Sequence, residues 1–216
     1  MIDVRMFTVG PVQENCFFVR RQGAQSAVVV DPGDESERLT AALETLGITT
    51  VEAILLTHTH FDHIGAVAPL ARATGAPVYC PELETIVLAN IMDYVPWPGF
   101  GPFESYEADH TVAGGETLDL AGLELEVLFT PGHSPGHVTY SATGENALFS
   151  GDVLFQGSVG RVDLPGGDWP TLLSSIEMLV NRFSPETTVY PGHMGLTTLG
   201  RECQSNPFLQ ELAANQ

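Results

Sequence analysis

Histidine and aspartate side chains are concentrated in one short segment of the sequence. From Thr57 to His63 the chain reads Thr-His-Thr-His-Phe-Asp-His, so three imidazoles and one carboxylate fall within six residues. Neutral imidazoles and ionised carboxylates are the side chains that bind zinc, iron and manganese. In an extended segment His58 and His60 point to the same side, and a following turn into a helix brings Asp62 and His63 round as a second pair. The segment therefore predicts a metal site that can offer ligands to two neighbouring ions.

Three later turns each carry one more residue of the same chemical type. Each turn follows an apolar run and has a glycine beside the potential ligand, which lets the backbone bend sharply and approach closely. One such turn is weak evidence, but together they supply the histidines and the carboxylate that the first segment lacks. The residues are His133 in Thr-Pro-Gly-His, Asp152 in Ser-Gly-Asp and His193 in Tyr-Pro-Gly-His.

The apolar runs before these turns indicate the elements that position them. Residues 27–30 and 53–57 have the continuous apolar character of strands buried on both faces. Side chains that follow strand ends in α/β folds point into the crevice beyond the sheet, where sites form. Strands alternate with helices in the first half, and the second half is rich in hairpins. The predicted strands are 2–9, 15–21, 27–30, 53–57, 77–80, 123–130, 137–142, 146–151 and 189–190, and the predicted helices include 63–74, 81–92 and 200–212.

The charge of the chain limits its partners. Eight basic residues, all of them arginine, stand against 27 acidic residues, and the net charge is −19. The lack of lysine excludes mechanisms that need a lysine amine, such as a Schiff base. Nucleic acids and anionic membranes require basic patches, so we expect neither as a partner. The length of 216 residues fits one large domain, and we expect residues 1–216 to form it, as a monomer or a small homo-oligomer.

The three cysteines favour a reducing compartment. They are Cys16, Cys80 and Cys203, an odd number without CxxC spacing, so a disulfide framework is not expected. The N-terminus does not have the pattern of a signal peptide. No apolar stretch approaches the ~20 residues that span a bilayer. These features predict a cytoplasmic protein.

The order of the ligand-type residues resembles that of the metallo-β-lactamase superfamily. The motif that carries the resemblance is His-x-His-x-Asp-His at 58–63, followed by His133, Asp152 and His193. Within the superfamily the sequence is most similar to the glyoxalase II, or hydroxyacylglutathione hydrolase, branch, and there to its short single-domain forms. The segments that support this branch are 13–16, 57–65, 130–137, 150–152, 160–168 and 206–209.

This resemblance implies a fold and a ligand set. The fold would be an α/β, four-layer αββα sandwich with the site at one edge of two central sheets. One metal would be held by His58, His60 and His133, the other by Asp62, His63 and His193, and Asp152 would bridge them. Zinc is the first expectation for the two divalent ions, and iron and manganese suit the same ligands.

The resemblance also implies an activity, hydrolysis of a small-molecule thioester such as lactoylglutathione by a hydroxide that bridges the two metals. Asp62 and Asp152 would serve catalysis as metal ligands, because two metals bring a water close to ionisation at neutral pH. Full-length glyoxalase II enzymes carry a C-terminal helical domain, whereas 23 residues follow His193 here, so we expect altered selectivity for the thiol carrier. Arg161 lies where the family places a basic residue against the carrier, and a purely structural role for this arginine is the alternative.

Two other activities use the same fold. One is a persulfide dioxygenase with a single iron held by His58, His133 and Asp152. The other is a lactonase or β-lactamase-type hydrolase.

Three further features have an open role. The uncharged segment 94–103 contains four aromatic residues, and it either packs as structure or covers a pocket. His137 is expected to support the site without binding metal. Asp31 ends a buried strand, and its carboxylate could accept a hydrogen bond from a ligand such as His58 or from the adjacent turn, or simply belong to an Asp-Pro-Gly turn.

Overall fold

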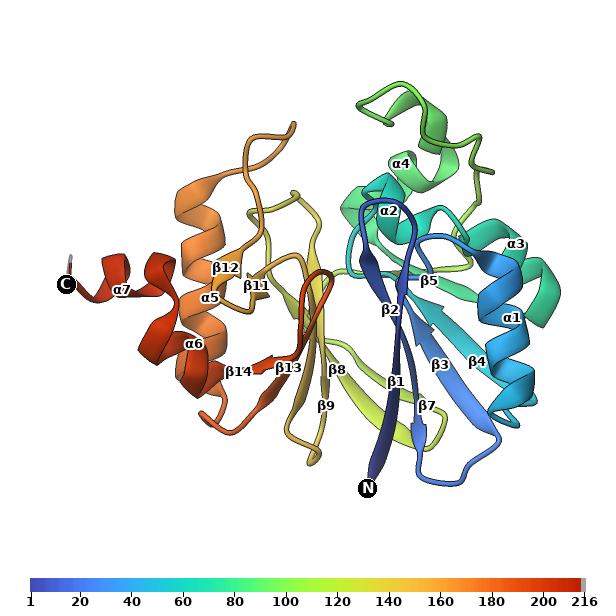
Figure 1. Ribbon diagram of the computed structural model, residues 1–216, viewed down its shortest axis with the longest axis horizontal. Coiled ribbons are helices and arrows are strands. Elements are labelled where there is room, and N and C mark those ends of the chain that lie inside the picture. The colour runs from blue at the N-terminus through green and yellow to red at the C-terminus, as the bar shows by residue number, and fades with distance from the viewer. Residues whose placement is uncertain (215–216) are drawn as a thin grey trace.

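The first half of the chain forms a six-stranded sheet in the computed structural model, which describes the backbone of residues 1–214 and the side chains of residues 1–210 (Figure 1). Strands β1 to β3 are antiparallel neighbours, and β3 to β6 run parallel. The strands lie in chain order: β1 (Ile2–Val9), β2 (Glu14–Arg21), β3 (Ser26–Val30), β4 (Thr50–Leu55), β5 (Val78–Pro81) and β6 (His110–Val112).

The second half forms another six-stranded sheet, in the order β14-β13-β10-β9-β8-β7. Strand β9 is antiparallel to both β8 and β10, and β10 is parallel to β13, so β8, β10 and β13 all end at the same edge. The strands are β7 (Thr117–Leu120), β8 (Leu123–Phe129), β9 (Val138–Ala142), β10 (Ala147–Gly151), β13 (Thr188–Pro191) and β14 (Thr197–Thr198), with a small separate hairpin of β11 (Leu154–Phe155) and β12 (Ser158–Val159).

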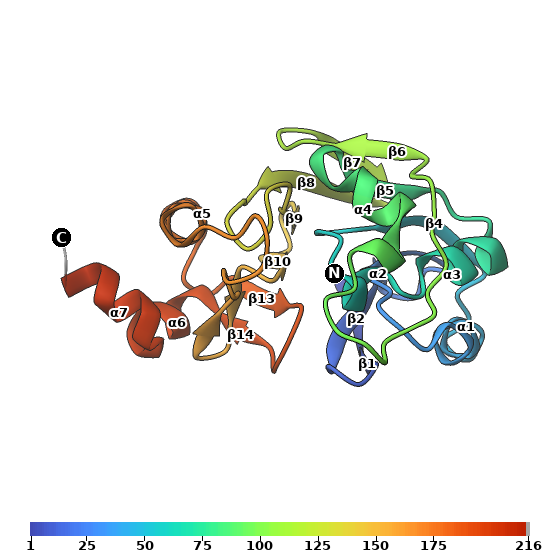
Figure 2. The ribbon, with the colours of Figure 1, turned by 90° about the horizontal axis from the view of Figure 1, so that it is seen from above.

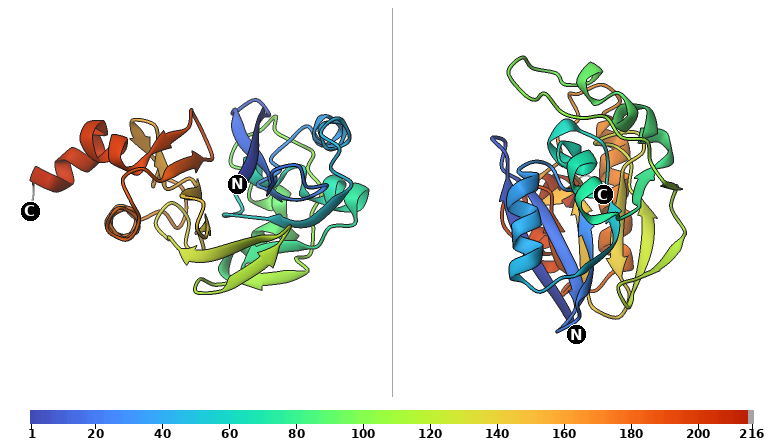
Figure 3. Two further views of the ribbon diagram at one scale, coloured as in Figure 1. Left: turned by 90° about the horizontal axis from the view of Figure 1, so that it is seen from below. Right: turned by 90° about the vertical axis from the view of Figure 1, so that its right-hand side faces the viewer.

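Helices cover the outer faces of the two sheets. Seen from above and from below, α1 and α3 lie outside the first sheet and α5 to α7 outside the second (Figures 2 and 3). None of the helices within residues 1–214 combines the length and the apolar character needed to cross a membrane. The helices are α1 (Ser36–Thr45), α2 (Phe61–Ile64), α3 (Val67–Thr74), α4 (Thr85–Ala89), α5 (Trp169–Arg182), α6 (Leu199–Ser205) and α7 (Pro207–Ala214), with 3₁₀ turns η1 (Glu82–Glu84) and η2 (Ile91–Asp93).

The core between the sheets explains why they face each other. Phe17 of β2 and Phe149 of β10 are both buried, and their rings meet edge to face at 5.7 Å. Val28, Val30 and Tyr140 belong to the same apolar cluster. The alternate residues Val29 and Phe18 instead join the cluster beneath α1 and α3. Strands with two apolar faces thus separate two helical layers, and the αββα sandwich predicted for this α/β chain is confirmed.

Several predicted helices are interrupted. The prediction of one helix over 63–74 is wrong, because the chain turns between α2 and α3 where Gly65 packs tightly: a Cβ there would lie 2.4 Å from the carbonyl oxygen of Gly33. The helix predicted over 200–212 divides at Asn206, since Pro207 disfavours helical backbone before it. The segment 81–92 forms two 3₁₀ turns around the short α4. The short strands β6, β7, β11, β12 and β14 were not predicted, because two to four residues show no periodicity.

Candidate metal centre

The turn after β4 is anchored by a buried carboxylate. Asp31, which follows β3, accepts hydrogen bonds from the backbone N–H of Thr57 at 2.8 Å and from its hydroxyl at 2.6 Å. The chain stays extended to His60, and α2 begins at Phe61. His58 and His60 therefore precede the helix while Asp62 lies in its first turn, the arrangement that the spacing predicted.

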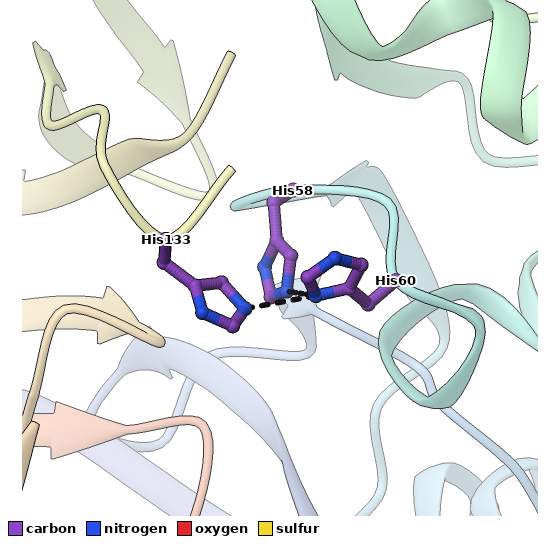
Figure 4. Close-up of side chains that lie close together, drawn as sticks. All are labelled: His58, His60 and His133. Carbon is purple, nitrogen blue, oxygen red and sulfur yellow. Dashed lines mark hydrogen bonds between the residues drawn. The ribbon is translucent and has the colours of Figure 1, made fainter. Parts of the chain in front are cut away.

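Three imidazoles form the first ligand group. The Nδ1 atom of His60 lies 3.1 Å from Nε2 of His58 and 2.8 Å from Nε2 of His133 (Figure 4). His58 and His133 are buried, and His60 is partly exposed. All three ligand atoms fall within 4.8 Å of one another, so this group could hold a metal ion.

Asp62, His63 and His193 form the second group. The Nε2 atom of His193 lies 3.3 Å from Oδ2 of Asp62, and Nε2 of His63 lies 3.9 Å from that same oxygen. Their ligand atoms also lie within 4.8 Å of one another. The second group thus takes two residues from α2 and one from the turn after β13, whereas the first takes two from the turn after β4 and one from the turn after β8.

Asp152 faces both groups. Its Oδ2 atom lies 3.5 Å from Nε2 of His133 and 3.6 Å from Nε2 of His193, and its Oδ1 atom lies 3.4 Å from Nε2 of His63. A carboxylate in this position can contact an ion in either group. All seven residues predicted as ligands are therefore brought together at one edge of the two sheets.

Hydrogen bonds orient the imidazoles. Nδ1 of His133 donates to the carbonyl oxygen of Arg161 at 2.7 Å, and Nδ1 of His193 lies 3.3 Å from the carbonyl oxygen of Gln13. Nδ1 of His63 contacts the carboxylate of Asp31 at 3.1 Å, and Nδ1 of His58 contacts the hydroxyl of Thr57 at 3.1 Å. These four rings thus present Nε2 to the centre, as metal-binding histidines do when another group holds Nδ1.

The role of Asp31 follows from these contacts. Its ligand partner is His63 rather than His58, and it also binds the adjacent turn through Thr57. Although Asp31 groups spatially with His58 and His63, its two oxygens already accept these hydrogen bonds. Asp31 therefore supports the ligands from behind.

Glycines let two ligand turns approach closely. Gly132, before His133, has φ +128°, and a Cβ there would lie 2.2 Å from the backbone nitrogen of Leu172 in α5. A Cβ on Gly192 would lie 2.3 Å from Oδ1 of Asp152. Neither position has room for a side chain, so these glycines are required by the packing of the site.

The electrostatics favour a positive ion. Burial lowers the pKa of His60 to about 4 and that of His58 well below its usual range, so both imidazoles are neutral at pH 7 and free to bind metal. For His63 burial acts in the same direction, but the carboxylates around it, Asp152 first, raise its pKa well above the usual value. His193 is affected likewise, and its pKa is raised. The carboxylates of the second group thus stabilise positive charge at this point.

The residues present fit a pair of metal ions. Nε2 of His63 and Oδ1 of Asp152 are buried and have no hydrogen-bond partner among the described residues. Buried polar atoms are rarely left so, and a bound ion is one of the few explanations. The donor set of imidazoles and carboxylates suits zinc, iron or manganese.

A buried glutamate links two of the ligand segments. Glu84, only 4% exposed, accepts hydrogen bonds from the N–H and hydroxyl of Thr59, from the hydroxyl of Ser134 and from the N–H of Gly136. It therefore ties the segment of His58 and His60 to the turn of His133. Glu84 could not be recognised from the sequence, because a glutamate in an expected helix is ordinarily a surface residue.

His137 supports the site from behind Asp152. Its Nε2 atom accepts the backbone N–H of Asp152 at 3.1 Å, and its Nδ1 atom lies 3.0 Å from the hydroxyl of Thr130. The ring stacks at 5.0 Å on that of His58. His137 thus supports a ligand turn without joining either ligand group, in keeping with the role expected for it.

A cavity of about 650 Å³ lies over the centre and includes His60, Asp62, His133, Asp152 and His193 in its lining. The segment 94–103 both lines this cavity and packs as structure, the two roles considered for it from the sequence. Tyr94, Pro96 and Trp97 line this cavity, whereas Phe100 and Phe103 pack on Phe61. Arg161 also lines the cavity.

Comparison with known proteins shows the family of the chain. The family model described as "Metallo-beta-lactamase superfamily" matches residues 9–193. The probable metallo-hydrolase YqgX of Bacillus subtilis is 39% identical over 95% of this chain and 96% of its own length. The hydroxyacylglutathione hydrolase GloC of Haemophilus influenzae is 34% identical over 96% of this chain and 98% of its own.

Solved structures give the same result. The BLEG-1 B3 metallo-beta-lactamase matches with a TM-score of 0.90 and 40% identity over 96% of this chain and 99% of its own. TTHA1623, solved in a di-iron-bound form, matches with a TM-score of 0.83 and 43% identity over 95% of this chain and 100% of its own. With its ligand motif, its sandwich and these relatives, the chain belongs to the metallo-beta-lactamase superfamily and is a metal-dependent hydrolase of that superfamily.

Proposed function

We propose that the protein is a binuclear thioesterase that hydrolyses 2-hydroxyacyl thioesters such as lactoylglutathione. The observation that carries the proposal is the convergence of seven ligand-type side chains beneath one cavity, with Asp152 between two groups. The relative named hydroxyacylglutathione hydrolase supports the reaction class, since the alignment with it covers nearly the whole chain.

The chain's own residues would hold and orient the reacting groups. His58, His60 and His133 would bind one ion, and Asp62, His63 and His193 the other, with Asp152 shared. Two such ions supply a nucleophilic water at neutral pH and polarise the acyl carbonyl. Hydrogen bonds from the Nδ1 atoms keep the rings from turning, so the ligand atoms stay aimed at the centre. Zinc remains the first expectation, and the di-iron form of TTHA1623 makes iron the second metal to test.

Cysteine is not expected to act as the nucleophile. Cys16 and Cys80 are fully buried, and burial raises the pKa of each thiol above its usual value. A thiol is nucleophilic as the thiolate, so both are inert at pH 7. Cys203 is exposed, but it is not among the described residues that line the cavity.

The test is turnover by protein of known metal content. Zinc- and iron-loaded samples are given lactoylglutathione, and loss of the thioester absorbance is followed. We expect activity that disappears in Asp152→Ala and persists in Asp119→Ala, which removes an exposed carboxylate on β7 far from the ligand turns. Full metal occupancy without thioester hydrolysis would refute the proposal.

A β-lactamase activity is the second candidate, because BLEG-1 is described as a B3 metallo-beta-lactamase and shares 40% identity. The same samples given a β-lactam panel and a lactone panel separate the two. Faster turnover of a β-lactam than of any thioester would select this candidate.

A further inference from the structure

One wall of the cavity above the centre is built from apolar side chains of the segment 83–97. Leu83, Val87, Tyr94, Pro96 and Trp97 all line it. Leu83 is 64% exposed and Tyr94 49%, so this apolar surface is open to a ligand rather than used for internal packing. Exposed apolar side chains gathered at a cavity mark a surface that binds apolar groups.

The facing wall is also apolar. Phe155 and Val159 come from the β11–β12 hairpin, Leu164 and Pro165 from the loop that follows it, and Met194 from the turn after His193. Met194 is 55% exposed. Apart from Arg161, the buried carboxylate of Glu84 and the ligand residues, a molecule entering the cavity therefore meets uncharged walls on both sides.

Arg161 is the only arginine or lysine among the described residues that line the cavity. Its Nε and Nη2 atoms donate to the two carboxylate oxygens of Asp163, at 2.6 and 2.7 Å. Its guanidinium carbon also lies 5.6 Å from the ring centre of Trp97. This two-pronged ion pair offsets part of the charge that Arg161 would otherwise offer to an anionic ligand, although both side chains are partly exposed.

Glutathione is a poor electrostatic match for these walls. It carries two carboxylates and one ammonium group, and each carboxylate needs a cationic or N–H partner when it leaves water. The protein as a whole, with a net charge of −19, also repels an anion.

We propose that the site selects thioesters whose thiol part is uncharged and apolar, and that Asp163 is a specificity-determining residue because it neutralises Arg161. Arg161 then contacts the thiol part through its stem and its guanidinium plane, not as an anchor for a carboxylate. This inference rests on the proposed thioesterase function and adds the class of thiol.

The experiment compares two thioesters with one acyl group. Lactoylglutathione and the lactoyl thioester of benzyl mercaptan are given to zinc-loaded protein, and each kcat/KM is corrected for the reactivity of that thioester toward hydroxide. We expect the benzyl thioester to be preferred about tenfold through a lower KM, the size that burial of one apolar ring predicts.

Charge variants then test Asp163. Asp163→Asn should lower KM for lactoylglutathione about threefold, as release of an exposed charge pair predicts, and leave KM for the benzyl thioester unchanged. The matched control is Glu126→Gln, which frees Arg182 from a surface ion pair in which its Nη2 atom contacts both oxygens of Glu126, and which makes the same change in net charge. The control should alter neither KM. Adding Arg161→Met to Asp163→Asn should abolish the gain.

The outcomes separate the two proposals. A wild-type preference for lactoylglutathione, or an equal effect of Asp163→Asn on both thioesters, overturns the inference while the thioesterase function stands. Asp163 is 67% exposed, so its variants should fold, and equal thermal melting checks this. Hydrolysis of neither thioester by metal-loaded protein refutes the proposed function, and the inference falls with it.

Discussion

Replacing Glu84 should loosen the fold and the metal centre together. Its carboxylate is buried and accepts four hydrogen bonds, two from backbone N–H groups and two from hydroxyls. Hydroxyls can turn to other partners, whereas the N–H groups of Thr59 and Gly136 are fixed by the backbone. The cost of losing the carboxylate is therefore set mainly by these two donors.

Two variants of Glu84, to Gln and to Ala, remove different parts of this stabilisation. In Glu84→Gln the amide oxygen still accepts one of the N–H groups, but the amide NH₂ faces the other, which should cost about 1–3 kcal/mol. In Glu84→Ala both N–H groups lose their acceptor and a small cavity forms, so we expect a loss of about 4 kcal/mol.

Urea unfolding of chelator-treated protein measures these losses without a contribution from bound metal. Glu82→Gln, on the same 3₁₀ turn but exposed, is the matched control and should lie within about 0.5 kcal/mol of wild type. Glu84→Gln as stable as wild type, or Glu84→Ala no worse than Glu84→Gln, would refute this account of the network.

The link to the metal centre gives a second readout. Because Thr59 lies between His58 and His60 and Ser134 follows His133, loss of the carboxylate should let the first ligand group spread. We expect the affinity for zinc to fall by about 10- to 100-fold in Glu84→Ala, measured by competition with a chromophoric chelator. An unchanged affinity for zinc would mean that Glu84 does not hold the metal ligands in place.

Three other predictions follow from the packing. Gly132→Ala should cost at least about 3 kcal/mol in urea unfolding, since its Cβ would overlap the backbone of Leu172, and a stable variant would contradict that geometry. His137→Phe keeps the ring but removes the acceptor for the N–H of Asp152, so zinc affinity should fall about tenfold by chelator competition, whereas an unchanged value would make the ring mere packing. Metal at 100 times its Kd should raise the unfolding free energy by about 2.7 kcal/mol for each ion bound, relative to the chelated protein, and equal melting with and without metal would mean that none is bound.

Much of the centre could be predicted because its ligands are local signals. His58, His60, Asp62 and His63 fall within six consecutive residues, and the glycines beside the other ligands mark backbones that bend at strand ends. The layers followed from strands with two apolar faces. These features depend on near neighbours in the chain, which a sequence displays directly.

The supporting contacts could not be predicted because they join distant segments. Glu84 meets Ser134 across 50 positions, and no periodicity in either segment reports that contact. The pairing of Arg161 with Asp163 is close in sequence, but only the fold shows that it occurs beside a cavity. The helix break at Gly65 likewise depends on a distant contact, the close approach to Gly33. The break before Pro207 is instead a local steric effect of the proline on the residue before it.

The division of the ligands between the sheets has a mechanical consequence. The segment that follows β4 of the first sheet, including α2, supplies His58, His60, Asp62 and His63, while turns of the second sheet supply the other three ligands. Each ligand group takes two residues from the first sheet and one from the second, and Asp152 of the second sheet faces both. Bound ions would therefore cross-link the sheets at the edge where the cavity opens. The apolar core between the sheets holds them together away from that edge, so we expect metal to tighten the cavity walls more than the rest of the fold.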